Sequence, residues 1–217
     1  MQKNIFIASI SIILASIFFV INDAIINYLS VNQIQFYHFV FYGSPAYLIV
    51  PLFLYFKGDF KKHLSSSNYY ILLIRSLLFA PMPFLTFIAL KNISLPEFTT
   101  LNMASPLIAS ILAIFFLKEK LNFYTYLSLT FGFLGVLFVI QPGFQNFNFY
   151  FIVPLFGVIL ITITTLIVNK YYYVTSAAGY FIYGGSIIHV LSIFLFIYDP
   201  LLISLFEFFL IITASIF

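Results

Sequence analysis

The sequence predicts an all-α integral membrane protein, built as an inverted repeat of five-helix units. The first observation is composition, because apolar residues make up 63% of the chain and charged residues 7%, whereas soluble domains usually carry about 45–50% and about 25%. The second is a series of eight apolar stretches, most of them near the roughly 20 residues that a helix needs to cross a bilayer. The third is an internal similarity between the beginning and the end of the chain.

The eight predicted spans are joined by short connections, so spans that follow one another in sequence are antiparallel in the membrane. The first span is long, contains the polar pair Asn22 and Asp23, and lacks a small-residue cleavage site, so we interpret it as a retained helix and not as a signal peptide. In chain order the spans are Ile5–Leu29, Ile34–Phe56, Tyr69–Leu90, Leu95–Leu117, Asn122–Gln141, Phe149–Val168, Ala177–Tyr198 and Leu201–Phe217.

The basic residues predict the orientation of the spans. With the N-terminus in the cytoplasm, only Lys91 lies on the outer side, and positively charged connections are typical of the cytoplasmic side. We therefore expect a multi-pass protein of the inner (plasma) membrane of a bacterium, with a cytoplasmic N-terminus. The basic residues on the inner side are Lys3, Lys57, Lys61, Lys62, Arg75, Lys118, Lys120 and Lys170.

The same composition excludes several kinds of function. The chain has no cysteine, which excludes disulfide scaffolds and thiolate metal sites, and we expect neither a cofactor nor a metal. Its basic residues form no stripe that would bind nucleic acid. The expected partners are the lipid bilayer and a small-molecule substrate. Gly132 and Gly135 permit close helix packing, either within the chain or in a homodimer.

An internal repeat appears when the sequence is shifted by 142 residues without gaps. Residues 25–27 then align with residues 167–169, and residues 39–44 with residues 181–186. Apolar matches are common in such a chain, but the matches of Asn27 with Asn169 and of the Gly43–Ser44 pair with Gly185–Ser186 are less so. The first span thus corresponds to the sixth and the second to the seventh.

A unit of five helices reverses its direction when it is repeated, because five is an odd number. We divide the chain into a first unit at 1–146 and a partial second unit at 147–217, which gives about eight of an expected ten spans. The chain would then be a fragment or a truncated product, or the closing helices would come from elsewhere. Inverted repeats are typical of secondary transporters, whose substrate site lies near the midplane.

Several segments of the first unit resemble the EamA-like transporters of the drug/metabolite transporter superfamily. The resemblance lies in Arg75–Phe79, Phe87–Leu90, Pro96–Thr100, Ser105–Leu107, Phe116–Glu119 and Gly132–Val136. It implies a ten-helix inner-membrane carrier with a central cavity that opens to each side in turn. Residues Asn22–Leu29 are similar to the S-adenosylmethionine uptake transporters of that superfamily. The family often has an arginine in its second helix, where this chain has Phe41 or Tyr42.

Ionisable side chains inside a membrane cost a few kcal/mol, so each is a candidate for the transport site. Asp23 shares a helical face with Ser16 and Asn27. It can pair with a cationic group of the substrate or carry a coupling proton. The alternative role is that of an interfacial residue that caps the helix end. His38 is the candidate partner of Asp23, because histidine titrates near neutral pH. The alternative role for His38 is hydrogen-bonded packing.

Two polar stripes complete the candidate site. Thr99, Asn102, Ser105 and Ala109 recur at steps of three and four in the fourth span, and Thr162, Thr165 and Asn169 repeat this pattern in the sixth. Residue spacing alone favours close helix packing, whereas the family resemblance implies that the fourth span lines the cavity. Arg75 also has two possible roles, either contacting the cytoplasmic headgroups or binding an anionic substrate group.

The function that these observations favour is transport of a small metabolite by alternating access. The resemblance suggests a cationic amino acid derivative such as S-adenosylmethionine as the substrate. One alternative is a non-functional truncated transporter product. The other is an integral-membrane enzyme, which is disfavoured because the sequence has neither an HExxH motif nor a close acidic pair. We therefore do not expect an enzyme.

Overall fold

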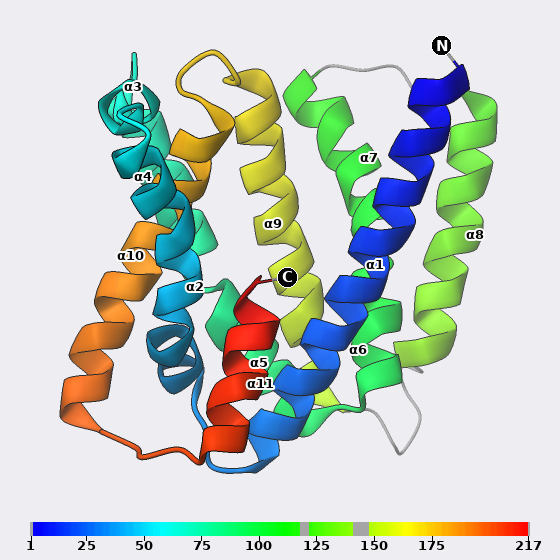
Figure 1. The fold of residues 1–217 in the computed structure, drawn as a ribbon. Coiled ribbons are helices and arrows are strands. Elements are labelled where there is room, and N and C mark those ends of the chain that lie inside the picture. The colour runs from blue at the N-terminus through cyan, green and yellow to red at the C-terminus, as the bar shows by residue number, and fades with distance from the viewer. Residues whose placement is uncertain (1, 118–121, 141–147, 217) are drawn as a thin grey trace.

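The computed structural model describes residues 2–117, 122–140 and 148–216, and the regular elements in these ranges are all helices (Figure 1). The helices are α1 (Gln2–Val31), α2 (Phe36–Phe56), α3 (Phe60–Leu64), α4 (Tyr69–Phe79), α5 (Met82–Asn92), α6 (Leu95–Asn102), α7 (Ser105–Leu117), α8 (Phe123–Ile140), the 3-10 turn η1 (Phe149–Phe151), α9 (Ile152–Lys170), α10 (Ala177–Tyr198) and α11 (Leu205–Ile216). The chain passes up and down through one bundle, as short connections between apolar helices require.

Five of the described segments are long and apolar enough to cross a membrane, which supports a multi-pass membrane protein. They are Ile13–Val31, Phe36–Phe56, Tyr69–Asn92, Phe149–Lys170 and Ala177–Tyr198. The apolar helices within Phe123–Phe138 and Leu205–Ile216 are shorter. The predicted ends Gln141 and Phe217 of the fifth and eighth spans lie outside the described residues.

Two of the predicted spans each consist of two helices, and a proline lies at the division. The predicted span Tyr69–Leu90 is divided into α4 and α5 at Ala80 and Pro81, and the predicted span Leu95–Leu117 into α6 and α7 just before Ser105. Pro81 and Pro106 have no N–H to donate to the carbonyl four residues earlier, and the proline ring clashes with that carbonyl. The polar stripe of the fourth span therefore lies on two helices and not on one continuous face.

The directions of the helices alternate in Figure 1. The first helix, α1, runs downward and α2 upward, whereas α9 runs upward and α10 downward. Consequently α9 is antiparallel to α1, and α10 is antiparallel to α2. The N-terminus of α1, the helix α3 and the connection between α9 and α10 lie at the same end of the bundle.

The basic residues gather at this end. Lys57 follows α2, Lys61 and Lys62 lie in α3, and Lys170 ends α9, whereas Lys91 lies in the last turn of α5 at the opposite end. The charged connection formed by Lys118, Glu119 and Lys120 lies outside the described residues.

The largest buried core fills the end of the bundle opposite α3. Leu29 of α1, Leu90 of α5, Leu101 of α6 and Ile211 of α11 are almost completely buried there. A smaller cluster around Leu72 joins α4 to the start of α10. The helix α2 also packs against α10, while α11 packs on α2 and α4 packs on α10.

Candidate functional site

A cavity of about 270 Å³ lies between α2 and α10, and α1, α4, α5 and α11 complete its walls. Four polar side chains converge on it from different helices: Asn22, Arg75, His189 and Ser215. A second hollow of about 480 Å³ lies against α4 and α10, but the polar side chains on its walls carry only hydroxyl groups. Ligand sites usually combine apolar walls with a few converging polar groups, so the first cavity is the candidate site.

One face of α2 and one face of α10 form the main walls of this cavity. Phe39, Gly43 and Tyr47 recur at steps of four in α2, and such spacing places side chains on one face of a helix. Phe181, Gly185 and His189 recur in the same way in α10 and line the same cavity. Each face therefore offers two rings separated by a glycine.

The two glycines allow the helices to approach closely. A Cβ atom on Gly185 would lie 2.5 Å from the ring of Tyr47, and one on Gly43 would overlap the hydroxyl of Ser215 in α11. Tyr47 stacks on His189, with ring centroids 4.0 Å apart and ring planes at 17°. The Tyr47 hydroxyl also donates a hydrogen bond to the carbonyl of Ile182. The middle of the α2–α10 contact is thus fixed by one aromatic pair and one hydrogen bond.

Arg75 of α4 brings a positive charge to the cavity wall. Its Nη1 donates to the carbonyl oxygen of Tyr180 at 2.7 Å, and its Cζ lies 5.1 Å from the centroid of the Phe79 ring. A Cβ atom on Gly184 would overlap this guanidinium group, so α10 has room for Arg75 only because residue 184 is a glycine.

Beyond the cavity, α2 is fastened to the far end of α10 by a cluster that we name the Asp199 latch. Tyr37 donates to the Asp199 carboxylate, and His38 Nε2 is 2.8 Å from the Asp199 carbonyl oxygen. The Tyr42 hydroxyl donates to the carbonyl of Leu201 at 2.7 Å. These five residues close the end of the α2–α10 pair that lies away from α3.

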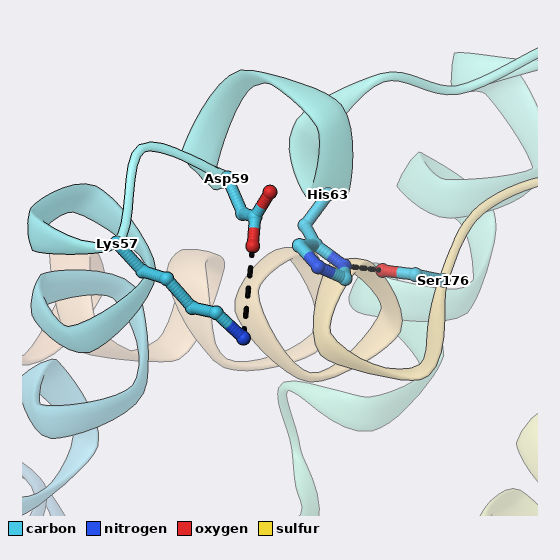
Figure 2. Close-up of polar contacts among 4 residues, drawn as sticks. All are labelled: Lys57, Asp59, His63 and Ser176. Carbon is cyan, nitrogen blue, oxygen red and sulfur yellow. Dashed lines mark hydrogen bonds and ion pairs between the residues drawn. The ribbon is translucent and has the colours of Figure 1, made fainter.

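A second cluster, the His63 latch, fastens the other end of the pair and includes the contact in Figure 2. His63 Nδ1 lies 2.8 Å from the hydroxyl of Ser176, which also caps α10 by accepting from the backbone N–H of Gly179. The Tyr183 hydroxyl donates to the carbonyl of Leu64 at 2.9 Å. The ion pair of Lys57 with Asp59, at 3.8 Å, lies in the chain leading to this latch (Figure 2).

The sequence-predicted site residues occupy several places, and none of them is among the residues that line the cavity. They are Asp23, Asn27, His38, Thr99, Asn102, Ser105, Thr165 and Asn169. His38 is buried, and both of its ring nitrogens are used, because Nδ1 accepts from the backbone N–H of Gln35 and Nε2 contacts Asp199. His38 is therefore occupied by structural contacts and is not paired with Asp23.

The remaining candidates act locally or lie apart. Asn27 donates to the carbonyl of Leu90 at 2.8 Å and so joins α1 to α5. Thr99 and Thr165 each donate to a carbonyl four residues earlier in their own helix. The break between α6 and α7 separates Asn102 from Ser105, and Asn169 is exposed near the end of α9.

Asp23 is half-buried in α1, next to the cavity-lining residue Asn22. The neighbouring Asn22 donates to the carbonyl of Ala214 in α11 at 2.6 Å. The Asp23 carboxylate has no hydrogen-bond partner in the described part of the chain. It is therefore close to the candidate site along the chain without belonging to its wall.

Sequence reasoning did not select Tyr47 or Gly184 for the site, and it gave His189 either a packing role or a secondary place in a cavity. One signal that would have found two of them was present, because the 142-residue shift that aligns Gly43 with Gly185 also aligns Tyr47 with His189. Both lie one helical turn after the matched glycine and point to the same face. The role of Gly184 has no signal in the sequence, since it depends on the position of Arg75 from another helix.

Comparison with known proteins identifies the first two thirds of the chain. Residues 2–141 match the sequence model of the EamA-like transporter family. No curated protein and no solved structure matches the chain.

Proposed function

The chain belongs to the EamA-like transporter family, and from this premise we propose that it is a secondary transporter that moves a small metabolite through the cavity between α2 and α10 by alternating access. The family is one of membrane transporters of the drug/metabolite type, which argues against an enzyme. The observation that carries the proposal is the cavity itself, enclosed by helices from both parts of the chain and supplied with a few polar groups.

The proposal includes an inverted repeat, with α1 and α2 equivalent to α9 and α10. The opposite directions of α1 and α9 agree with it. So do the cavity walls, because the 142-residue shift relates Phe39 to Phe181, Gly43 to Gly185 and Tyr47 to His189, and all six residues line the same cavity. Equivalent faces that meet around one cavity are what a half-turn about an axis in the membrane plane would produce.

The packing of the neighbouring helices also supports this relationship. The helix α11 packs on α2, and α4 packs on α10. In the proposed repeat, α4 lies in the third span of the first unit and α11 in the third span of the second. Each of the two helices α2 and α10 is thus covered by the third span of the other unit. The latches follow the same rule. The first turns of α2 bind the connection that follows α10, and the first turns of α10 bind the connection that follows α2.

Alternating access needs two closures that open in turn, and the two latches are suited to this role. Both consist of side-chain hydrogen bonds between separate elements, which can break without unfolding a helix. We propose that the His63 latch faces the cytoplasm, because Lys57, Lys61, Lys62 and Lys170 lie at its end of the bundle. The N-terminus would then be cytoplasmic, the membrane the inner (plasma) membrane, and the Asp199 latch would face outward.

Asp23 stays in the proposal as the carrier of a coupling proton. A carboxylate that is half-buried in a membrane helix is costly unless it takes up a proton or a partner, and Asp23 lies next to the cavity-lining Asn22. The sequence-based suggestion of a cationic amino acid derivative has less support, because the described cavity wall contains Arg75 and no carboxylate.

The test is transport by the purified chain in liposomes. The vesicles are loaded with a defined mixture of amino acids, organic acids, nucleosides and S-adenosylmethionine, and the retained solutes are measured by mass spectrometry. We expect one solute class to leave faster than from protein-free liposomes. Val40→Phe, which fills part of the cavity, should slow this loss, whereas the same change at Val190, 53% exposed on α10, should not. Equal retention of every solute in all samples would contradict the proposal.

A further inference from the structure

Arg75 is the one formally charged side chain among the described residues that line the cavity. The other polar lining groups are amide, hydroxyl, phenol and imidazole groups from Asn22, Ser215, Tyr47 and His189. The ion pair recorded for the described residues joins Lys57 and Asp59 in the chain leading to the His63 latch and does not involve Arg75. The charge of Arg75 therefore has no carboxylate partner in the described structure.

The guanidinium group has more donors than it uses. Arginine offers five N–H donors in a planar fork, and Arg75 makes one side-chain hydrogen bond, from Nη1 to the carbonyl of Tyr180. Its Nε is buried without an acceptor among the described residues. A buried N–H group without a partner is costly. The site therefore lacks a hydrogen-bond acceptor for Arg75.

The fork is held in position from two sides. The ring of Phe79 lies beside Cζ at 5.1 Å, and Gly184 leaves open the space that the guanidinium group occupies. The contact with Tyr180 fixes one edge of the fork, so the remaining donors keep a defined direction. A fixed, partly desolvated arginine is the usual means by which proteins bind carboxylate or phosphate groups.

The rest of the cavity is suited to a flat apolar group. Tyr47 stacks on His189 and its ring lies 5.3 Å from that of Phe181, and Phe39 and Phe79 add further aromatic surface. A volume of about 270 Å³ is at the small end of ligand sites. The space is large enough for one small ring system beside Arg75.

From these observations we infer that the cavity binds a small organic anion, with the anionic group on Arg75 and a planar apolar part against Tyr47 and Phe181. The inference rests on the proposed transport function and gives that function a substrate class. It also limits the sequence-based expectation of an amino acid derivative, because such a molecule would bind through its carboxylate and not through its cationic group.

The test compares three probes of one shape and different charge: benzoate, benzamide and benzylammonium. Each is added to the purified protein in a neutral detergent, and binding is followed by the thermal unfolding midpoint. We expect benzoate to raise the midpoint and the other two probes to leave it unchanged. An equal change of the midpoint by all three probes, or a change by benzylammonium alone, would overturn the inference.

Variants then locate the binding site. Arg75→Gln should weaken benzoate binding by roughly tenfold or more, the loss expected for a charged hydrogen bond. Arg75→Lys, which keeps the charge but not the fork, should retain part of it, and Lys91→Gln, at the far end of α5, should bind as the unaltered protein does. Unchanged benzoate binding by Arg75→Gln would overturn the inference.

Two further measurements separate this inference from its alternatives. Phosphatidylglycerol that raises the midpoint while benzoate does not would overturn the inference, because the anion would then be a lipid headgroup. The liposome experiment separates the inference from the proposed function. Transport of solutes without any preference for anions would contradict the inference and leave the function standing, whereas selective benzoate binding without transport would contradict only the function.

Discussion

Tyr47 of α2 and His189 of α10 stack on each other, with ring centroids 4.0 Å apart, and the two residues are related by the same 142-residue shift that aligns Gly43 with Gly185. Two residues that are exchanged by a half-turn can touch each other only near the axis of that rotation. The Tyr47–His189 contact therefore marks the place where the axis of the proposed inverted repeat would cross the bundle, on the wall of the cavity between α2 and α10.

This contact predicts an energetic coupling between the two helices. Tyr47→Phe keeps the stacked ring and loses the hydrogen bond to Ile182, which should cost about 0.5–1.5 kcal/mol. Tyr47→Leu should lose about 0.5–1.5 kcal/mol more from the aromatic pair. Thermal unfolding in detergent of Tyr47→Leu, His189→Leu and the double variant measures the coupling. Strictly additive effects would show that the two rings do not stabilise each other.

The packing of Arg75 against Gly184 predicts a glycine that transport requires. A methyl group at residue 184 would overlap the guanidinium group, so Gly184→Ala should displace Arg75 and slow transport about tenfold or more, through loss of a charged hydrogen bond. Gly135→Ala is the matched control, because a Cβ atom there meets no atom within 4 Å and alanine favours a helix. Similar transport rates for the two variants would argue against a role for Arg75.

The orientation of the bundle can be measured directly, because the chain contains no cysteine. A cysteine at Lys61 in α3 should react with a membrane-impermeant maleimide only from the cytoplasmic side, and one at Asn92, the last residue of α5, only from the outside. Both residues are exposed. The unaltered protein serves as the blank. Labelling with the opposite sidedness would reverse the assignment of the two latches.

Asp23 predicts a dependence of transport on pH. If its carboxyl group carries the coupling proton, Asp23→Asn should insert into the membrane normally but lose the change of transport rate between neutral and mildly acidic pH. Asn22→Ala, which instead loses the hydrogen bond to Ala214, should keep that change. Identical pH profiles of Asp23→Asn and the unaltered protein would remove Asp23 from the mechanism.

The sequence was sufficient to predict the class of fold and most helix positions, because apolar length and short connections control both. The seventh span was predicted at Ala177–Tyr198, the bounds that α10 has in the structure. The division at Pro81 was not predicted, whereas Pro106 was expected to disturb the fourth span, because a proline in an apolar stretch is compatible with either a kink or two helices. The complete set of eight spans and the repeat remain predictions.

The candidate site was less predictable, since its residues come together only through packing. Polar residues such as Asn27 and His38 were predicted to bind the substrate. In the structure they form hydrogen bonds to other segments of the bundle. The cavity wall is built instead from aromatic residues and glycines, such as Tyr47 and Gly184, that are common in this chain. Arg75 had two open roles from the sequence, and its position on the cavity wall beside Gly184 is the starting point of the anion site that we infer.

The most direct test of alternating access through this cavity is the reactivity of a single cysteine at Ser215, on the cavity wall. We expect Ser215→Cys to react with a membrane-impermeant maleimide added from either side of the membrane. Adding Asp199→Ala, which weakens the Asp199 latch, should raise the rate from the outside, and adding His63→Ala, which removes the contact with Ser176, should raise it from the cytoplasm. Reaction from one side only, at a rate that neither change alters, would contradict the account.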